Sequence, residues 1–328
     1  MENILVTGGA GYIGSKICYD LIDKGFKVVI IDNLTTGHKK LINKNCVFYK
    51  VNVGDKKSLF KIFEKHNINK VIHMAASLSV EESMIKPQKY YLNNVYNTKK
   101  LLDVCAKFKI KKFVFSSTCA VFGEQKKKVK PSDTPSPSSH YGLTKLLCEK
   151  LIETYAKKYN FSYFILRYFN VVGADYKLRV GPINRSGQLF KNLSISILKK
   201  NKKINIYGKN YNTKDGTCIR DYIDVNDLSN IHINCLKKII NKKSLIINCG
   251  YGKGHSVLEV INYFENISGK KYTKKFKKPR KGDISEIICS PSKNKYNKII
   301  LSNNYNIKDS IKSSLKWEFK IKNMNRFK

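Results

Sequence analysis

Short apolar runs alternate with amphipathic stretches along the first half of the chain. The apolar runs, each short enough for a buried strand, are 4–6, 27–31, 47–49, 71–76, 112–118 and 163–170. Helical spacing of apolar residues marks the stretches 12–24, 87–108 and 139–158. This order of strands and helices predicts an α/β fold with a Rossmann-type, doubly wound parallel sheet.

The first strand leads into a glycine-rich turn, Thr7-Gly8-Gly9-Ala10-Gly11-Tyr12-Ile13-Gly14. Such a turn brings backbone amides and a helix N-terminus to a pyrophosphate, and glycine at position 14 lets the helix pack close to the strand. Asp32 follows the next strand at the offset where a carboxylate binds a ribose 2′-hydroxyl. Because a carboxylate repels a 2′-phosphate, the sequence favours NAD over NADP.

Small or polar residues follow the later strands. Asn52-Val53 follows the third strand, where a side-chain amide is placed to meet an adenine. Ala75-Ala76 ends the fourth strand and lets the backbone pass close to a cofactor. His73, inside that apolar strand, is predicted to be a packed core histidine. The fifth strand ends in Ser116-Ser117-Thr118, and ligands of open α/β sheets bind beyond such carboxyl ends.

Tyr141 and Lys145 lie one turn apart on the same face of a predicted helix. Such pairs are frequent by chance in a chain with 20 tyrosines, but this pair follows a nucleotide-binding pattern and a strand that ends in hydroxyl groups. A phenol has a pKa of about 10, and a neighbouring ammonium group stabilises the phenolate. We therefore expect Tyr141 to be a general base whose pKa is lowered toward neutrality.

The second half of the chain has longer irregular stretches, at 176–186 and 208–217. The helices expected there are 189–199, 227–241 and 257–267. We expect a Rossmann domain at 1–172 and a smaller mixed α/β lobe at 173–328, with part of 218–250 packing on the first domain.

Two compact polar clusters mark this second half. They are Arg220-Asp221-Tyr222 and Pro279-Arg280-Lys281-Gly282-Asp283. Guanidinium groups bind a diphosphate well, but the same residues are equally typical of a surface ion-pair cluster. The local sequence leaves both interpretations open.

Composition narrows the function further. A formal net charge of +39, from 63 Lys and Arg against 24 Asp and Glu, is spread over every predicted helix and turn without a nucleic-acid-binding signature, so we expect no nucleic-acid partner. Nine scattered cysteines predict reduced thiols in a cytoplasmic protein, and no cysteine or histidine spacing indicates a metal site. No apolar run is long enough to cross a membrane.

The chain resembles the extended short-chain dehydrogenase/reductase superfamily and, within it, the UDP-glucose 4-epimerase family. The motifs that carry the resemblance are Thr7-Gly8-x-x-Gly11-x-x-Gly14, Asp32-Asn33-Leu34, Ser116-Ser117-Thr118, Tyr141-x-x-x-Lys145 and Arg167-Tyr168-Phe169-Asn170. The resemblance implies NAD-dependent interconversion of UDP-galactose and UDP-glucose through a transient 4-keto sugar. It also implies a homodimer formed by helices near 90–108 and 141–158. Related dehydratases carry an Asp-Glu pair after the threonine, and Cys119-Ala120 in its place favours epimerisation.

The resemblance also implies site residues. Tyr141 is the expected base on the sugar 4-hydroxyl, Thr118 hydrogen-bonds that hydroxyl, and Lys145 holds the nicotinamide ribose. The implied NAD contacts are Gly8, Gly11, Tyr12, Ile13, Gly14, Asp32, Asn33, Leu34, Asn52, Val53, Ala75, Ala76, Asn93, Ser116, Tyr141, Lys145 and Phe169. The implied substrate contacts are Thr118, Tyr141, Asn170, Gln188, Leu189, Tyr207, Arg220, Tyr222, Arg280, Asp283 and Ile287.

Three alternatives stay open from the sequence. One is a 4-epimerase of another UDP-sugar, an N-acetylhexosamine or uronic acid form, because Ile287 at the position that faces the sugar has intermediate bulk. Another is a catalytically inactive NAD-binding regulator, although Thr118, Tyr141 and Lys145 occur together. The third is a nucleic-acid-binding protein. Departures from the family pattern at Asn52, Leu78, Phe122 and Gln188–Lys191 bear mainly on the substrate side.

Overall fold

The computed structural model describes residues 3–125, 128–184, 188–199, 202–237, 244–280, 282–290 and 305–323. By its internal contacts the chain divides into two compact units. The first comprises Met1–Gly123, Asp133–Tyr168 and Ser229–Asn248, and the second comprises Glu124–Ser132, Phe169–Leu228 and Cys249–Lys328. The domain boundary expected between residues 172 and 173 stays a prediction.

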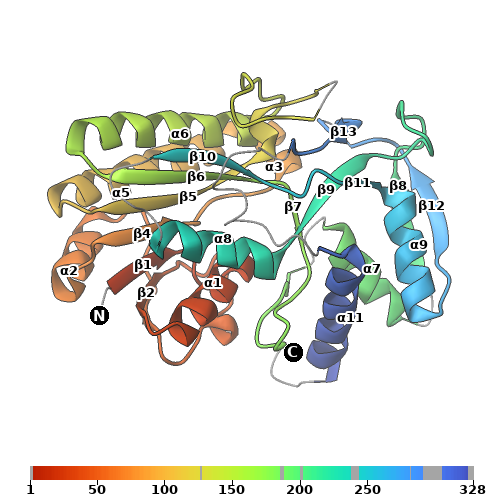
Figure 1. The fold of residues 1–328 in the computed structure, drawn as a ribbon, viewed down its shortest axis with the longest axis horizontal. Coiled ribbons are helices and arrows are strands. Elements are labelled where there is room, and N and C mark those ends of the chain that lie inside the picture. Colours follow the sequence, from red (N-terminus) through yellow and green to blue (C-terminus); the bar gives the residue numbers. More distant parts are fainter. Residues whose placement is uncertain are drawn as a thin grey trace. The chain divides into compact units, whose positions relative to one another are not determined.

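The first unit is built around a seven-stranded sheet (Figure 1). Its strands are β1 (Asn3–Thr7), β2 (Lys27–Ile31), β3 (Val47–Tyr49), β4 (Lys70–His73), β5 (Lys112–Thr118), β6 (Ser162–Tyr168) and β10 (Leu245–Cys249). The strand order is β10-β6-β5-β4-β1-β2-β3, and the neighbours from β6 to β3 pair in parallel. β1 and β2 each bury four consecutive residues, as strands covered on both faces do. The predicted Rossmann-type fold is confirmed.

The winding of this sheet reverses between β1 and β4. The chain runs outward from β1 through β2 to β3 and then returns to β4, which pairs with the other side of β1. Thr7 at the end of β1 is in register with His73 at the end of β4. Ligands of doubly wound sheets bind at the carboxyl ends beside such a reversal. The glycine turn that follows Thr7 therefore lies at the expected ligand-binding edge.

Helices cover the sheet of the first unit. They are α1 (Tyr12–Asp23), η1 (Lys39–Leu41), α2 (Lys56–His66), α3 (Val80–Ile85), α4 (Pro87–Tyr90), η2 (Tyr91–Tyr96), α5 (Asn97–Lys107), η3 (Cys119–Val121), α6 (His140–Tyr159) and α8 (Val225–Lys237), whose first residues belong to the second unit. The single helix predicted over 87–108 is interrupted, because η2 is a π-helix that a 3.6-residue period does not reveal. The strand predicted over 71–76 ends at His73, and residues 238–241 of a predicted helix lie outside the described ranges.

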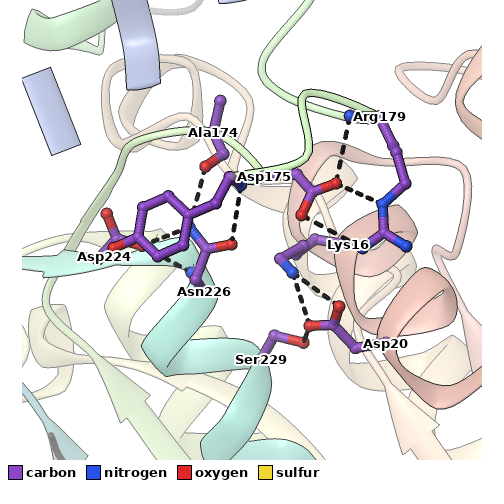
Figure 2. A network of polar contacts seen from close by, with 9 residues as sticks. Lys16, Asp20, Ala174, Asp175, Arg179, Asp224, Asn226 and Ser229 are labelled. Carbon is purple, nitrogen blue, oxygen red and sulfur yellow. Dashed lines mark hydrogen bonds and ion pairs between the residues drawn. The ribbon is translucent and has the colours of Figure 1, made fainter. Parts of the chain in front are cut away.

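Polar contacts fix the later segment of the first unit onto α1. Ser229 on α8 donates a hydrogen bond to Asp20 at 2.6 Å, and Lys16 forms an ion pair with the same carboxylate at 2.7 Å (Figure 2). Lys16 is buried, so its charge is neutralised inside the structure. A segment far along the sequence thus becomes part of the nucleotide-binding unit.

The second unit has smaller sheets than the first unit and more residues in loops. β9 (Ile219–Asp224) pairs with β7 (Asn170–Val172), β11 (Gly254–Ser256) and β13 (Glu286–Ile287), while β8 (Lys203–Tyr207) pairs with β12 (Thr273–Lys277). Its helices include α7 (Leu189–Ile197), α9 (Val257–Ser268) and α11 (Ile307–Asn323), which share a buried apolar cluster. The described residues of the two stretches predicted to be irregular, 176–184 and 208–217, contain neither helix nor strand.

Buried polar side chains organise the start of α8 within the second unit. Asn226 donates to the Asp224 carboxylate at 2.7 Å and to the Ala174 carbonyl at 2.9 Å, and Arg179 pairs with Asp175 at 2.5 Å (Figure 2).

Across the part of the chain that the structure describes, no helix has the length and apolar character needed to span a membrane. The same residues contain no group of three His, Cys, Asp or Glu side chains suited to a metal ion.

Candidate active site

The glycine turn after β1 folds closely against β4. Gly8 adopts a left-handed φ of 72°, and a Cβ there would lie 2.8 Å from the Ala75 nitrogen. A Cβ on Gly14 would lie 2.2 Å from the Gly8 carbonyl oxygen, so only glycine lets α1 begin at this point. Gly11 is the N-cap of α1 and supplies no side-chain hydrogen bond. The first amides of α1, at Tyr12 and Ile13, therefore suit a pyrophosphate.

Asp32 is buried directly after β2, where two backbone amides fix its carboxylate. Oδ2 accepts a hydrogen bond from the Ala10 amide at 3.0 Å, and Oδ1 accepts one from the Leu34 amide at 2.8 Å. Because Ala10 belongs to the glycine turn, the carboxylate is held beside the proposed pyrophosphate site. This arrangement fits a ribose hydroxyl donor, and together with the glycine turn it fits NAD.

The end of β4 is supported by a buried chain of hydrogen bonds. Thr7 Oγ1 accepts from the Ala75 amide at 3.3 Å and lies 2.7 Å from His73 Nδ1, while His73 Nε2 lies 2.7 Å from Thr98 Oγ1. Burial lowers the pKa of His73 to about 3, and the charge of Lys145 adds to the effect. His73 is therefore a neutral packed histidine, as predicted, and its hydrogen bonds support the small residues that follow β4.

The π-helix η2 brings two amide side chains to the loop after β4. Asn94 is buried, and its side chain accepts from the Ser77 amide at 2.8 Å and donates to the Ser77 carbonyl at 3.1 Å. It also donates to Thr144 on α6 at 3.2 Å. Asn93 donates to the Ser77 hydroxyl at 3.0 Å. Asn93 was a predicted cofactor contact, whereas the structural role of Asn94 was missed, although a buried asparagine in an apolar helix face is itself a signal.

The catalytic candidates meet where β5 ends and α6 begins. Ser139 caps α6 by accepting from the Gly142 amide at 3.1 Å, which puts Tyr141 in the first turn and Lys145 in the second. The Tyr141 amide donates to Ser83 at 3.1 Å. Thr118, the last residue of β5, is buried and forms a side-chain hydrogen bond with Tyr141. The structure therefore brings the predicted hydroxyl, phenol and ammonium groups together in one unit.

Lys145 is a buried charge with few compensating groups. Its exposed fraction is 2%, and its Nζ lies 4.4 Å from the centre of the Phe115 ring on β5. Burial lowers the pKa of Lys145 to about 8, while Cys148 and Glu149 act in the opposite direction. The ammonium form is thus retained at neutral pH.

The expectation for the pKa of Tyr141 is wrong in direction. Burial raises this pKa above the ordinary value, and the hydrogen bond from Thr118 offsets only part of the rise. Cys119 and Tyr90 raise it further. Lys145 is not among the groups that shift it, so among the residues that the structure describes Thr118 is the group that favours the phenolate.

Other predicted NAD contacts occupy varied positions. Tyr12, Ile13, Leu34, Ala75, Ala76 and Asn93 are half-buried, Val53 and Ser116 are buried in the first unit, and Phe169 is buried in the second. Two asparagines cap local turns: Asn33 accepts from the Thr35 amide at 3.0 Å, and Asn52 accepts from the Gly54 amide at 2.8 Å. Both side chains are exposed and have donors left for a ligand.

The two polar clusters of the second unit form one cluster. Arg220 on β9 pairs with Asp283 at 2.5 Å and also donates to the Ile284 carbonyl at 2.7 Å. Ile287 on β13 is buried in register with Arg220. Arg280 is exposed and stacks over the Tyr207 ring at 4.2 Å. A partly buried ion pair is therefore present, and the stacked Arg280 guanidinium is exposed.

The remaining substrate candidates are divided between surface and core. Asn170 on β7 is exposed and in register with Tyr222 on β9. Tyr222 packs against Phe190 with ring centres 5.3 Å apart, and it belongs to the apolar core. Gln188 is exposed at the N-cap of α7, and Leu189 is half-buried behind it.

The fold and the first-unit site define a dinucleotide-binding α/β protein of the short-chain dehydrogenase/reductase type, with a Thr-Tyr-Lys group at its sheet edge. Residues 4–250 match the NAD dependent epimerase/dehydratase family, and the chain belongs to that family.

Named relatives agree with this assignment. The chain is 36% identical to a UDP-glucose 4-epimerase of Azospirillum brasilense, over 96% of this chain and 91% of that one. It is 35% identical to a putative UDP-arabinose 4-epimerase of Arabidopsis thaliana, over 97% of this chain and 76% of that one. A UDP-glucose 4-epimerase of Bifidobacterium longum, solved with NAD+ and UDP, matches with a TM-score of 0.91 and 33% identity, covering 98% and 99% of the two chains.

Proposed function

We propose that the protein interconverts UDP-galactose and UDP-glucose as an NAD-dependent 4-epimerase. The observation that carries the proposal is the group formed by Thr118, Tyr141 and Lys145 at the end of β5, in the unit that also holds the glycine turn and Asp32. The family match and the named relatives support the same activity.

Tyr141, Thr118 and Lys145 have different roles in the proposed proton transfer. Tyr141 takes the proton of the sugar 4-hydroxyl and later returns it, as a positioned general acid-base group. The Thr118 hydroxyl hydrogen-bonds the phenol and thereby offsets part of the cost of forming a buried phenolate. Lys145 stays protonated at neutral pH and provides positive charge one helical turn away.

NAD, when bound, supplies reversible acceptance of the hydrogen at C4. Gly8, Gly11 and Gly14 give its pyrophosphate room, and Asp32 accepts a ribose hydroxyl. Tyr12, Ile13, Leu34, Ala75, Ala76, Asn93 and Phe169 are the further contacts in the proposal, together with Asn33, Asn52, Val53 and Ser116. Lys145 holds the nicotinamide ribose.

Beyond Thr118 and Tyr141 of the first unit, the proposed substrate contacts lie in the second unit. Arg280, with its exposed guanidinium over Tyr207, binds the diphosphate, and Asn170 contacts the UDP. Arg220 and Asp283 act as a pair, with Asp283 toward the uridine ribose. Gln188, Leu189, Tyr222 and Ile287 complete the proposed set.

The test is incubation of the pure protein with UDP-galactose, UDP-N-acetylgalactosamine and UDP-galacturonate, followed by separation of the products. We expect UDP-glucose from the first substrate. A second candidate is a 4-epimerase of another UDP-sugar, supported by the similarity to a putative UDP-arabinose 4-epimerase. UDP-arabinose is therefore included, and conversion of that sugar in preference to UDP-galactose overturns the primary proposal. An NAD-binding regulator without activity converts none of the four.

A homodimer through the helices near 90–108 and 141–158, which are η2, α5 and α6, is part of the proposal. Pro87, Tyr91, Leu92, Leu143 and Leu147 line a groove of about 400 Å³ on the first unit. Leu92 is 58% exposed and Leu143 41% exposed, so these helices present an apolar face. Tyr91 and Leu92, at the start of η2, are both exposed.

Sedimentation equilibrium tests the homodimer. Leu92→Glu places a charge in the apolar face and should yield monomers, whereas Lys150→Glu, at an exposed position farther along α6, should leave the dimer intact. A wild-type protein that sediments as a monomer contradicts this part of the proposal.

A cytoplasmic location and the absence of a nucleic-acid partner complete the proposal. All nine cysteines are free thiols, which supports a reducing compartment. Cell fractionation tests the location, and filter binding at physiological salt tests for nucleic acid, whose retention would contradict this part.

A further inference from the structure

Glu149 is a buried carboxylate that the proposed chemistry does not use. It lies on α6 one turn beyond Lys145, with an exposed fraction of 1%. Its Oε1 accepts from Arg167 Nε at 3.0 Å and its Oε2 accepts from Arg167 Nη2 at 2.7 Å, a bidentate ion pair. The Ser117 hydroxyl donates to Oε1 of the same carboxylate.

The partners of Glu149 lie on the two strands next to the catalytic group. Ser117 precedes Thr118 on β5 and is in register with Arg167 on β6. The Arg167 guanidinium also stacks over the Phe122 ring at 4.9 Å. The carboxylate therefore ties α6, which carries Tyr141, to the strand end that carries Thr118.

A buried ion pair needs an explanation beyond stability. Apolar residues of similar size usually stabilise a core as well as a buried pair does, because both ions lose their hydration. Glu149 and Arg167 are both nearly fully buried. Glu149 lies one helical turn from Lys145, so this ion pair also bears on the charge of that lysine.

The surroundings of Lys145 define that role. Phe115 on β5 and the neutral His73 on β4 face it from the sheet, and Cys148 and Glu149 interact with it from α6. Burial raises the pKa of Cys148 to about 11, so this thiol is uncharged at neutral pH. Glu149 is thus the anionic group among these neighbours.

We propose that Glu149 is a positioning residue that holds α6 against the end of β5 and keeps Lys145 in its charged form, while Arg167 fixes the Glu149 carboxylate. The catalytic consequence rests on the proposed function. Burial lowers the pKa of Lys145 to about 8 while Cys148 and Glu149 act in the opposite direction, so loss of the Glu149 carboxylate should lower that pKa further. A neutral amine carries no positive charge into the site where, in the proposed function, Lys145 holds the nicotinamide ribose.

Three variants separate charge from structure: Glu149→Gln, Arg167→Met and the double variant. The pH dependence of kcat/KM and the thermal midpoint are measured for each holoenzyme. Each single variant leaves a buried group without its partner and should lower the midpoint by roughly 5 °C or more. The double variant removes both charges and should recover most of that loss.

The alkaline limb of the pH profile of kcat/KM distinguishes an effect of Glu149 on the charge of Lys145 from a purely structural ion pair. Glu149→Gln and the double variant should both lose activity at a pH lower than the wild type by about one unit. Arg167→Met should not move the limb downward, because the carboxylate remains. A double variant that recovers the wild-type limb together with the midpoint shows a merely structural pair and overturns the proposal. Where a single variant does not fold, the double variant decides the matter.

NAD binding gives a readout that needs no turnover. Ultrafiltration at a series of pH values should show that Glu149→Gln loses affinity for NAD at a lower pH than the wild type. If the wild type does not epimerise UDP-sugars but this shift is found, the proposed function fails and the role of Glu149 stands. If the wild type is active and neither NAD affinity nor the alkaline limb shifts, only the role of Glu149 fails.

Discussion

Replacement of Lys145 by methionine is predicted to stabilise the fold while it lowers activity. The difference between the ordinary lysine pKa of 10.5 and the value of about 8 corresponds to roughly 3 kcal/mol in favour of the neutral amine. Methionine avoids this cost but loses the contact of the ammonium with Phe115, worth about 1 kcal/mol. Lys145→Met should therefore raise the free energy of unfolding at pH 7 by about 2 kcal/mol, with turnover strongly reduced.

The stability advantage of Lys145→Met over the wild type should depend on pH. The unfolded lysine binds a proton more tightly than the buried one, so the destabilisation is complete below about pH 8 and disappears as the pH rises toward 10.5. The advantage of the variant should shrink over the same window. Urea unfolding followed by circular dichroism at pH 7 and pH 10 measures it, with NAD content matched because bound ligand stabilises the native state. A variant less stable than the wild type at pH 7, or an advantage unchanged at pH 10, refutes the reasoning.

Three further variants test the site. Tyr141→Phe should lower turnover by about 10²- to 10⁴-fold with an unchanged circular dichroism spectrum; near-normal turnover would remove Tyr141 from the mechanism. Gly14→Ala places a Cβ 2.2 Å from the Gly8 carbonyl, so acid extraction of the purified variant should yield much less NAD than extraction of the wild type. In Gly11→Ala the added Cβ would lie 3.3 Å from the same oxygen, so this variant should lower the thermal midpoint less than Gly14→Ala does. Equal losses of thermal midpoint in the two variants would contradict this account of the turn.

The features that were predictable from sequence are those fixed by local spacing. The glycine turn and Asp32 belong to one strand-helix-strand unit, and the structure joins them through the Ala10 amide. Tyr141 and Lys145 are one helical turn apart, so the helix alone puts them on one face. Thr118 was identified because parallel strands place their carboxyl ends along one edge.

The features that were missed depend on contacts between distant residues. All five residues of β12 are exposed and three of them are lysines, so no hydrophobic pattern in β12 predicts its pairing with β8. The ion pair between Arg220 and Asp283 joins two polar clusters that lie far apart in the sequence. The raised pKa of Tyr141 results from burial, which a helical spacing does not report. Glu149 was overlooked because its partners come from two other strands.

The fate of the hydrogen at C4 tests the central claim most directly. Epimerisation through a transient 4-keto sugar keeps this hydrogen within the site, while Tyr141 exchanges only the proton of the hydroxyl group. UDP-galactose deuterated at C4 should therefore give UDP-glucose that retains deuterium at C4, as read by mass spectrometry of the separated product. Loss of the label to water, release of a free 4-keto sugar, or NADH formed in proportion to product would contradict the account.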